Sequence, residues 1–296
     1  MTAHPELKLL NDPEGGSIPG VSGPVIDSHV HIFPERIFAP LRKWFDAYGW
    51  PLRYKMGAEE LIQFLLDRGL SHIVVFPFAH GPGMSAYLNS FTADTVKKFN
   101  GKVTGLATVF PGEKNAGQIL KQGFDLGLAG IKLHAHVQCF DLDEDYMDPV
   151  YDACEKHNRP MVIHAGREPK SEAYACDPHE ICSADRVRRL LEKRPGLRIM
   201  VPHLGVDEFE EYKKMTEEFD NLWLDTAMVI TDYLPLKEQP DLNEYRPDRV
   251  VYGSDFPNIP YAWDRELKRI VECVRDEGSL KKILYENSME LFALQD

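Results

Sequence analysis

The residues with the clearest chemical potential are in the segment Asp27-Ser-His29-Val-His31, which belongs to a short apolar run. Alternate side chains of a β-strand point to the same face, so Asp27, His29 and His31 are expected to project together. Two imidazoles at this spacing can bind one metal ion through their neutral nitrogens. Alone, the pair is equally compatible with ordinary polar residues at a strand end.

Three later apolar runs end in residues that can bind a metal or transfer a proton. His164 follows PMVI, His203 follows RIMVP, and Asp255 follows VVYGS. A single histidine at a strand end is more often structural than catalytic. Three such strand ends beside a His-x-His pair favour one shared site.

Eight apolar runs of strand length must position these residues. They are GPVIDSHVHIF, SHIVVFPF, KVTGLATVF, GIKLHAH, PMVIHAG, LRIMVPHLG, LWLDTAM and RVVYGSDFP. Helical patterns separate them, among them AEELIQFLLDRG, YMDPVYDACEKHN, ADRVRRLLEKRPG and DEFEEYKKMTEEFD, and SLKKILYENSMELFAL follows the last run. Strands alternating with helices predict a parallel α/β sheet, and eight strands favour a closed (β/α)8 barrel, with a doubly wound open sheet as the alternative.

One domain over residues 23–296 is expected, because no linker or low-complexity segment divides the chain. Residues 1–22, rich in Pro, Gly and Asp, are interpreted as an irregular N-terminal leader. The helical pattern from Ala58 is expected to stop at Gly69.

The overall charge excludes some partners. The chain has 47 acidic and 34 basic residues and a net charge of −13. Nucleic acid and anionic membranes would be repelled by this average surface, whereas a local Arg or Lys can still bind a small anionic substrate. The sequence lacks both a run of about 18 apolar residues and a signal-peptide pattern, which favours a cytoplasmic protein.

The five cysteines are odd in number and include no Cys-x-x-Cys pair. Reduced thiols in a cytosolic compartment are the simplest interpretation. Pairing of Cys176 with Cys182 is the alternative.

The chain from about residue 24 onward resembles the amidohydrolase superfamily, and more narrowly its amidohydrolase-related branch. That branch includes lactonases and the aminocarboxymuconate-semialdehyde and resorcylate decarboxylases. The motifs that carry the resemblance are IDSHVHIF, GIKLHAH, VIHAG, PHLG, VVYGSDFP and YENSMELFAL. By position, the resemblance implies that a divalent metal, usually zinc, is bound by His29, His31, His164 and Asp255, and that His203 is a catalytic imidazole.

Such a metal would lower the pKa of a bound water from about 15.7 to near 7 and would polarise a substrate carbonyl. Asp255 would then be both a ligand and the general acid/base. His203 would hydrogen-bond the hydroxide or the tetrahedral intermediate, or bind a second metal; the sequence does not decide between these roles.

Lys132 in GIKLH leaves the number of metal ions open. Some binuclear relatives carry a carboxylated lysine there, and a carbamate on Lys132 with His203 would complete a second metal site. The alternative is an ammonium that contacts a substrate carboxylate or Asp255. His134 lies on the same strand face as Lys132 and is a candidate to line the substrate pocket.

Arg167 is the candidate for binding an anionic substrate group, because a guanidinium matches a carboxylate bidentately. Its alternative is a loop arginine paired with Glu168 or Glu172. The loop SEAYACDPHEIC is expected to shape the pocket, with Tyr174 and His179 as candidate contacts. The remaining histidines, interpreted as structural or surface residues, are His4, His72, His80, His136 and His157.

The leading functional hypothesis is a metal-dependent hydrolase that attacks a lactone, amide or ester of a small organic acid. The alternative is a non-oxidative decarboxylase of an aromatic or muconate-like acid on the same metal site. A non-catalytic metal-binding protein is the third class, and the presence of every expected ligand argues against it. A homo-oligomer is compatible with this architecture.

Overall fold

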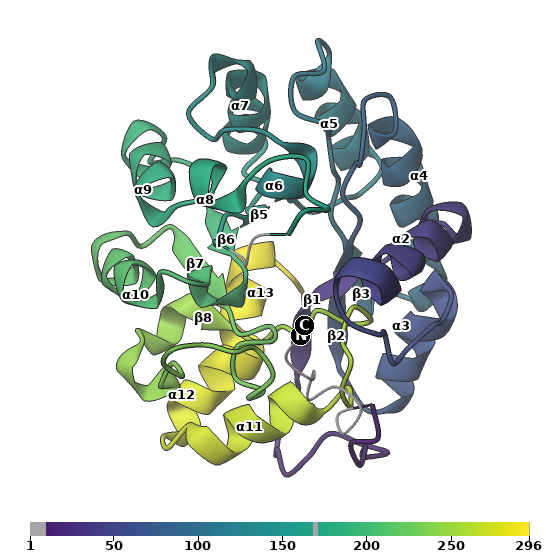
Figure 1. Ribbon diagram of the computed structural model, residues 1–296, viewed down its shortest axis with the longest axis vertical. Coiled ribbons are helices and arrows are strands. Elements are labelled where there is room, and N and C mark those ends of the chain that lie inside the picture. The colour runs from purple at the N-terminus through teal and green to yellow at the C-terminus, as the bar shows by residue number, and fades with distance from the viewer. Residues whose placement is uncertain (1–9, 168–170, 296) are drawn as a thin grey trace.

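The computed structural model describes residues 10–167 and 171–295. Short parallel strands form a central ring, and helices surround it (Figure 1). The strands are β1 (Ile26–His31), β2 (His72–Phe76), β3 (Val103–Gly105), β4 (Ile131–His134), β5 (Met161–His164), β6 (Ile199–Val201), β7 (Leu222–Asp225) and β8 (Val250–Val251). All eight lie within the predicted runs.

The outer helices follow the strands around the ring. They are α2 (Glu35–Tyr48), α3 (Ala58–Asp67), α4 (Ser85–Val96), α5 (Ala116–Asp125), α7 (Asp148–Lys156), α9 (Ala184–Lys193), α10 (Phe209–Glu218) and α11 (Arg265–Cys273). Shorter helices are α6 (Ala135–Gln138), α8 (Pro178–Ile181), α12 (Glu277–Lys281) and α13 (Asn287–Phe292). As predicted, α3 begins at Ala58 and stops just before Gly69, whose φ of +99° suits a glycine.

Two isolated bridges close the ring. Regular pairing gives the strand orders β1-β2-β3 and β4-β5-β6-β7-β8. Ala107 bridges to Ile131 and Val30 bridges to Phe256, both in parallel orientation. The backbone N–H of His31 donates to the carbonyl of Phe256 over 2.8 Å, so β1 is bonded to the segment after β8. The closed barrel is therefore confirmed, and the open sheet is wrong.

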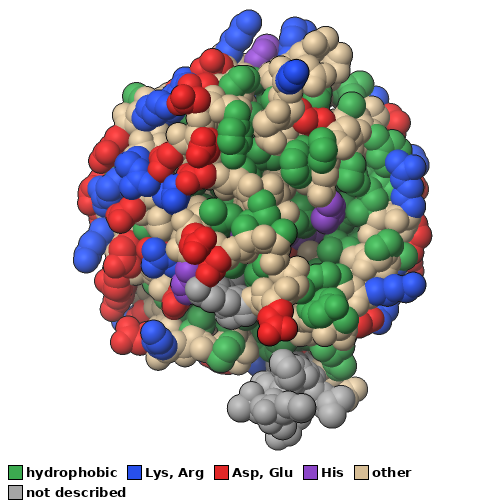
Figure 2. Space-filling model, turned by 45° about the horizontal axis from the view of Figure 1, so that its top comes forward, with side chains coloured by type: hydrophobic (Ala, Val, Ile, Leu, Met, Phe, Trp, Pro, Cys, Tyr) green, Lys and Arg blue, Asp and Glu red, His purple; other side chains and the backbone are tan. Residues whose placement is uncertain are grey.

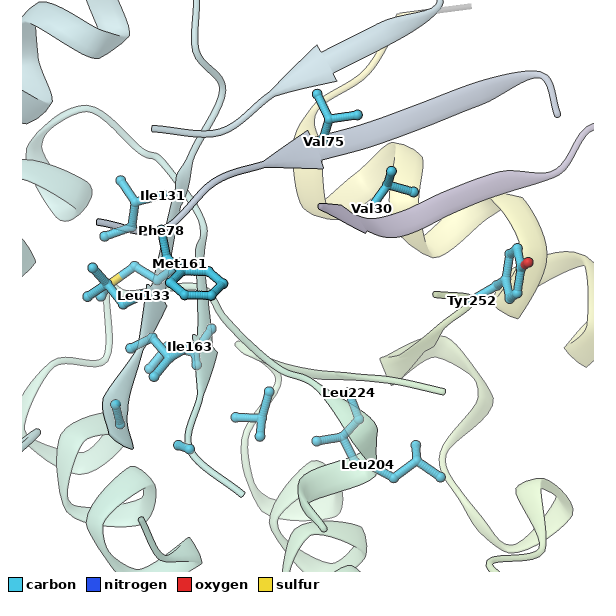
Figure 3. Packing of buried hydrophobic residues seen from close by; sticks show 14 of the residues in the cluster. Val30, Val75, Phe78, Ile131, Leu133, Met161, Ile163, Leu204, Leu224 and Tyr252 are labelled. Carbon is cyan, nitrogen blue, oxygen red and sulfur yellow. The ribbon is translucent and has the colours of Figure 1, made fainter. Parts of the chain in front are cut away.

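The strand residues alternate between two environments. Ile131, Leu133, Met161 and Ile163 point outward and pack in the layer between strands and helices (Figure 3). The intervening positions point into the barrel. Their apolar members form one buried cluster with Leu291 and Phe292 of α13. These members include Ile26, Val74, Phe76, Leu106, Val162, Met200, Trp223 and Val251.

The helix α13 closes the N-terminal end of the barrel. Leu291 and Phe292 belong to the interior cluster, and the hydroxyls of Ser28 and Ser288 lie 2.7 Å apart in a buried hydrogen bond. Apolar side chains thus fill this end, and chemistry is restricted to the opposite, C-terminal end of the strands.

The described part of the leader packs against the barrel without forming a helix or a strand. The N–H of Ile18 donates to the carbonyl of Arg68, the hydroxyl of Tyr54 donates to Glu14, and Arg265 pairs with Asp12. The leader therefore contacts both α3 and α11.

The expectation of five reduced cysteines is wrong for two of them. Cys139, which follows α6, is bonded to Cys176 in the loop after β5. The sequence could not reveal this pair, because the two loops meet only once adjacent strands bring them to the same barrel end. Because Cys176 is bonded to Cys139, the alternative pair of Cys176 with Cys182 is also wrong. Within the described residues, no helix has the length and apolar character needed to cross a membrane.

Candidate metal centre

Three of the predicted ligands meet at the C-terminal mouth of the barrel. His29 and His31 come from β1, and Asp255 comes from the segment after β8. The Nε2 atoms of the two histidines are 3.0 Å apart, and Oδ1 of Asp255 lies 3.0 Å from Nε2 of His31 and 3.5 Å from Nε2 of His29. All three side chains are at most 10 % exposed. This geometry suits a common cation.

An irregularity in β1 brings the two histidines together and removes Asp27 from the cluster. The pairing of β1 with β2 shifts register between Asp27 and Val30. Asp27 accepts hydrogen bonds from the backbone N–H of Ser254 and of His29, both over 3.1 Å. The expectation that Asp27 projects with His29 and His31 is therefore wrong, because simple alternation fails at a bulge. Burial raises the pKa of Asp27 to about 7.

Asp225, the last residue of β7, orients His29. Its Oδ2 lies 2.7 Å from Nδ1 of His29, and its Oδ1 accepts from the backbone N–H groups of His203 and Ala227. Because Nδ1–H of His29 donates this hydrogen bond to Asp225, Nε2 of His29 keeps its lone pair for a cation. Burial, followed by the charge of Lys132, holds the pKa of both His29 and His31 well below its ordinary value, so both rings are neutral at pH 7.

The backbone after β8 places Asp255 against His29. The N–H of Asp255 donates to the carbonyl of His29 over 2.9 Å, and Asp255 has a φ of +61°. Two residues earlier, a Cβ at Gly253 would lie 2.7 Å from the Cβ of His29, so any side chain there would collide. The glycine of the VVYGSD run thus lets the carboxylate reach the site.

His203 lies between the two sides of the mouth. Its ring centroid is 5.2 Å from that of His29 and 4.8 Å from that of His164. Its Nδ1 is 2.9 Å from the carbonyl of Ala227, which can only accept, so Nδ1 carries a proton and Nε2 is the acceptor nitrogen of a neutral ring.

His164, the fourth predicted ligand, lies beside two further histidines at the mouth. Its candidate ligand atom groups with those of His134 and His136, all within 4.8 Å of one another, and not with the group of His29, His31 and Asp255. His134 and His164 are register partners on adjacent strands, and their rings stack with centroids 4.2 Å apart. His29, His31 and Asp255 thus form one compact group, and His164 as a fourth ligand of the same ion stays a prediction.

Lys132 points into the barrel, one level below His134 on β4. It is fully buried, and its Nζ lies 4.8 Å from the centre of the Phe76 ring. The face of an aromatic ring attracts an ammonium and repels an anion, so this contact suits a protonated lysine.

Aromatic rings line the mouth beside both histidine groups. The Phe78 ring lies 5.6 Å from that of His31, 4.9 Å from that of His134 and 5.3 Å from that of Phe33. On the face of the molecule in Figure 2, histidine is visible in a depression bordered mainly by hydrophobic side chains, whereas most charged side chains lie towards the periphery. Phe78, with the aromatic rings beside it (the Phe78 wall), therefore lies next to the polar groups of the mouth.

Arg167 contacts a glutamate that the sequence did not suggest and a backbone carbonyl. Its Nη1 lies 3.4 Å from Glu208, and its Nε donates to the carbonyl of Cys182 over 3.2 Å. Glu168, like His4, lies outside the described residues. In the same loop, the Tyr174 ring packs 4.6 Å from that of His136, while His179 is exposed.

Sequence reasoning missed two residues of this centre. Asp225 ends the strand in the run LWLDTAM. This position, which resembles that of Asp255, could have marked it as a site residue. His136 was interpreted as structural or surface, but it is 1 % exposed and contacts His134 and His164. Its position two residues after His134 was the corresponding signal.

Comparison with known proteins gives the family. A family model described as amidohydrolase matches residues 26–294. The chain belongs to the amidohydrolase family. No curated protein sequence gives a significant match.

Solved structures share the amidohydrolase barrel at low identity. A 5-carboxyvanillate decarboxylase from Sphingomonas paucimobilis is 17% identical with a TM-score of 0.68, over 93% of this chain and 100% of that one. A dihydroxybenzoic acid decarboxylase from Polaromonas, solved with manganese and 2-nitroresorcinol, is 16% identical with a TM-score of 0.68, over 92% and 98%. An uncharacterised TIM-barrel protein from Bordetella bronchiseptica is 17% identical with a TM-score of 0.71, over 92% and 99%. These similarities confirm the fold, and the family match over residues 26–294 indicates an enzyme of the amidohydrolase superfamily.

Proposed function

We propose that this chain is a metal-dependent, non-oxidative decarboxylase of a small aromatic or muconate-like acid. The observation that carries the proposal is the Phe78 wall, which contacts both histidine groups and matches the flat face of an unsaturated acid. Solved decarboxylases of hydroxylated benzoic acids with the same barrel add support. Hydrolysis, the leading hypothesis from sequence, has no comparable support.

The donor set fits a divalent cation. His29, His31 and Asp255 would hold it, with His164 as the fourth predicted ligand. Neutral buried imidazoles with a carboxylate suit zinc, and one decarboxylase of the same fold was solved with manganese, so we propose a divalent metal without restricting it to zinc. When bound, the metal supplies a positive charge that polarises substrate oxygens.

Asp255 is proposed as the proton donor. Its protonated carboxyl would give a proton to the substrate carbon that bears the carboxylate. The bond from this carbon to the carboxylate then breaks, CO₂ leaves, and the bonding electron pair returns to the unsaturated system. Asp255 is left as a carboxylate and regains its proton from solvent, so the balance is one proton consumed for each CO₂ released.

His203, Lys132, His134 and Arg167 are proposed to position the substrate. The acceptor Nε2 of His203 suits a substrate hydroxyl, and Lys132 as an ammonium adds positive charge below the mouth. His134 contributes to the wall of the pocket beside Phe78. Arg167 would bind a second anionic group of the substrate by exchanging its contact with Glu208.

The test is a screen of the zinc- or manganese-loaded protein with hydroxybenzoates, carboxyvanillate and small lactones. We expect CO₂ and the decarboxylated product in equal amounts. Asp255→Asn should lower the rate by roughly 10²–10⁴-fold, and His203→Asn should lower it within the same range, with unchanged circular dichroism.

Asp241→Asn, which changes an exposed carboxylate at a distant turn, is the matched control and should keep full activity. Release of protons from lactones without CO₂ would contradict the proposal and support the hydrolase. Full activity of Asp255→Asn would remove this residue from the mechanism.

A further inference from the structure

A second group of three imidazoles lies at the barrel mouth. His134 ends β4, His136 lies in α6 directly after it, and His164 ends β5. One ring nitrogen of each lies within 4.8 Å of the corresponding nitrogen of the other two. Only His164 belongs to the ligand set predicted from the sequence.

Local structure explains why these three side chains converge. His134 and His164 are register partners on neighbouring parallel strands, so both rings leave the strands at the same height. The chain turns into α6 at Ala135, which places His136 beside this pair instead of further along the strand direction. The His136 ring is perpendicular to that of His134, at 89° and 4.5 Å, and nearly so to that of His164, at 80° and 5.2 Å.

The surroundings hold the group in place and shield it from water. His136 is 1 % exposed and His164 is 2 % exposed. Tyr174, from the loop after β5, packs against His136, and the disulfide between Cys139 and Cys176 ties this loop to the residue that follows α6. The three rings are thus fixed by two strands, one helix and a cross-linked loop.

A group whose ligand atoms are all imidazole nitrogens favours particular metals. Among the described residues, no carboxylate belongs to this group, whereas the group of His29 and His31 includes Asp255. Imidazole suits zinc, copper and nickel, while manganese, magnesium and calcium prefer oxygen. Tetrahedral zinc–nitrogen bonds of about 2.0–2.1 Å place the nitrogens about 3.4 Å apart, so small ring rotations would complete the geometry.

We propose that His134, His136 and His164 form a second transition-metal site of the zinc, nickel or copper class. It is separate from the site of His29, His31 and Asp255. In the fully loaded chain His164 binds the ion of this second site, while His29, His31 and Asp255 hold the other ion, so the chain holds two ions. This differs from a site bridged by a carbamate on Lys132, because neither Lys132 nor His203 is a ligand.

The experiment counts metal ions in the intact, oxidised chain. The protein is stripped with a chelator, loaded with Ni²⁺ or Zn²⁺, dialysed and measured by elemental analysis, with Co²⁺ absorption as a spectroscopic check on nitrogen ligands. The wild type should bind two ions. His136→Asn and His134→Asn should each bind one, and His31→Asn should lose the other ion instead.

The matched control is His157→Asn, which changes the histidine directly after the outer helix α7. This variant should keep two ions. His134 is partly exposed, so His134→Asn tests the site even if His136→Asn does not fold. The proposal is overturned if the wild type binds one ion that His31→Asn removes and His134→Asn retains, a result that leaves the proposed function standing. It is also overturned if both His134→Asn and His136→Asn keep two ions. A third outcome is a wild type with one ion that His134→Asn loses and His31→Asn keeps. That result would support the site of His134, His136 and His164 and would contradict the metal centre of the proposed function.

Discussion

The two ends of the barrel interior are built from the same strands but differ in chemistry. Val162 and Met200 belong to the apolar cluster that α13 closes, and His164, two residues above Val162 on β5, lies at the mouth. On β5, an apolar side chain that packs in the barrel interior is thus followed two residues later by a histidine that can bind a metal. Stability should depend on the closed end, and metal binding on the mouth.

The largest expected change in stability comes from the closed end. Met200→Ala removes a fully buried side chain from the interior cluster and should cost about 2–5 kcal/mol in the free energy of unfolding. Metal content should stay unchanged while the protein remains folded. Urea unfolding measures the first quantity and elemental analysis the second.

Met200→Leu, which conserves volume, is the control and should cost less than about 1.5 kcal/mol. If Met200→Ala loses metal at unchanged stability, the division between the two ends is wrong.

The next effect concerns the mouth. Asp225→Asn removes the carboxylate that accepts the Nδ1 proton of His29 and should weaken metal affinity about 10–100-fold. A chelator competition titration measures this affinity. The melting temperature should change much less than in Met200→Ala.

Glu266→Gln is the matched control for a buried carboxyl. Burial raises the pKa of Glu266 well above its ordinary value, and the amide of similar shape changes this buried carboxyl without touching His29. Its metal affinity should equal that of the wild type. An equal affinity in Asp225→Asn would show that His29 needs no partner at Nδ1.

The smallest effect concerns pH and involves neither end directly. Burial lowers the pKa of His72 from 6.5 to about 4, so the folded state favours the neutral ring. The resulting stability is present above pH 6.5 and is lost as the pH falls towards 4. Between pH 7 and pH 4.5 the free energy of unfolding should therefore fall by about 1–2 kcal/mol less in His72→Gln than in the wild type. This figure is smaller than the full pKa shift implies, because the ring is partly exposed to solvent. Thermal unfolding at pH 7 and pH 4.5 measures it.

Thr104→Val separates titration from hydrogen bonding, because it removes only the 2.9 Å partner of the His72 Nε2 atom. It should lower stability equally at both pH values. If the two variants have the same pH dependence, His72 does not titrate as described.

The sequence predicted the barrel because periodicity and composition reflect local rules. Each strand buries both faces and thus appears as an apolar run, and α3 ends where Gly69 permits a positive φ. His29, His31 and Asp255 were predictable for the same reason, since they stand at strand ends.

The remaining errors depend on contacts between distant segments. The register shift in β1 removes Asp27 from the cluster, and alternation along one strand cannot reveal it. The partnership of Asp225 with His29 and the disulfide between Cys139 and Cys176 join loops that approach only in the folded barrel.

The seam between β1 and the segment after β8 has a consequence for assembly. Asp27 and Ser254, hydrogen-bonded across it, are 227 positions apart. Joining such distant segments carries a large loop-closure cost, so this seam should form late, after neighbouring strands have paired. Because His31 and Asp255 stand on opposite sides of the seam, a tightly bound ion at their site would report that the ring has closed.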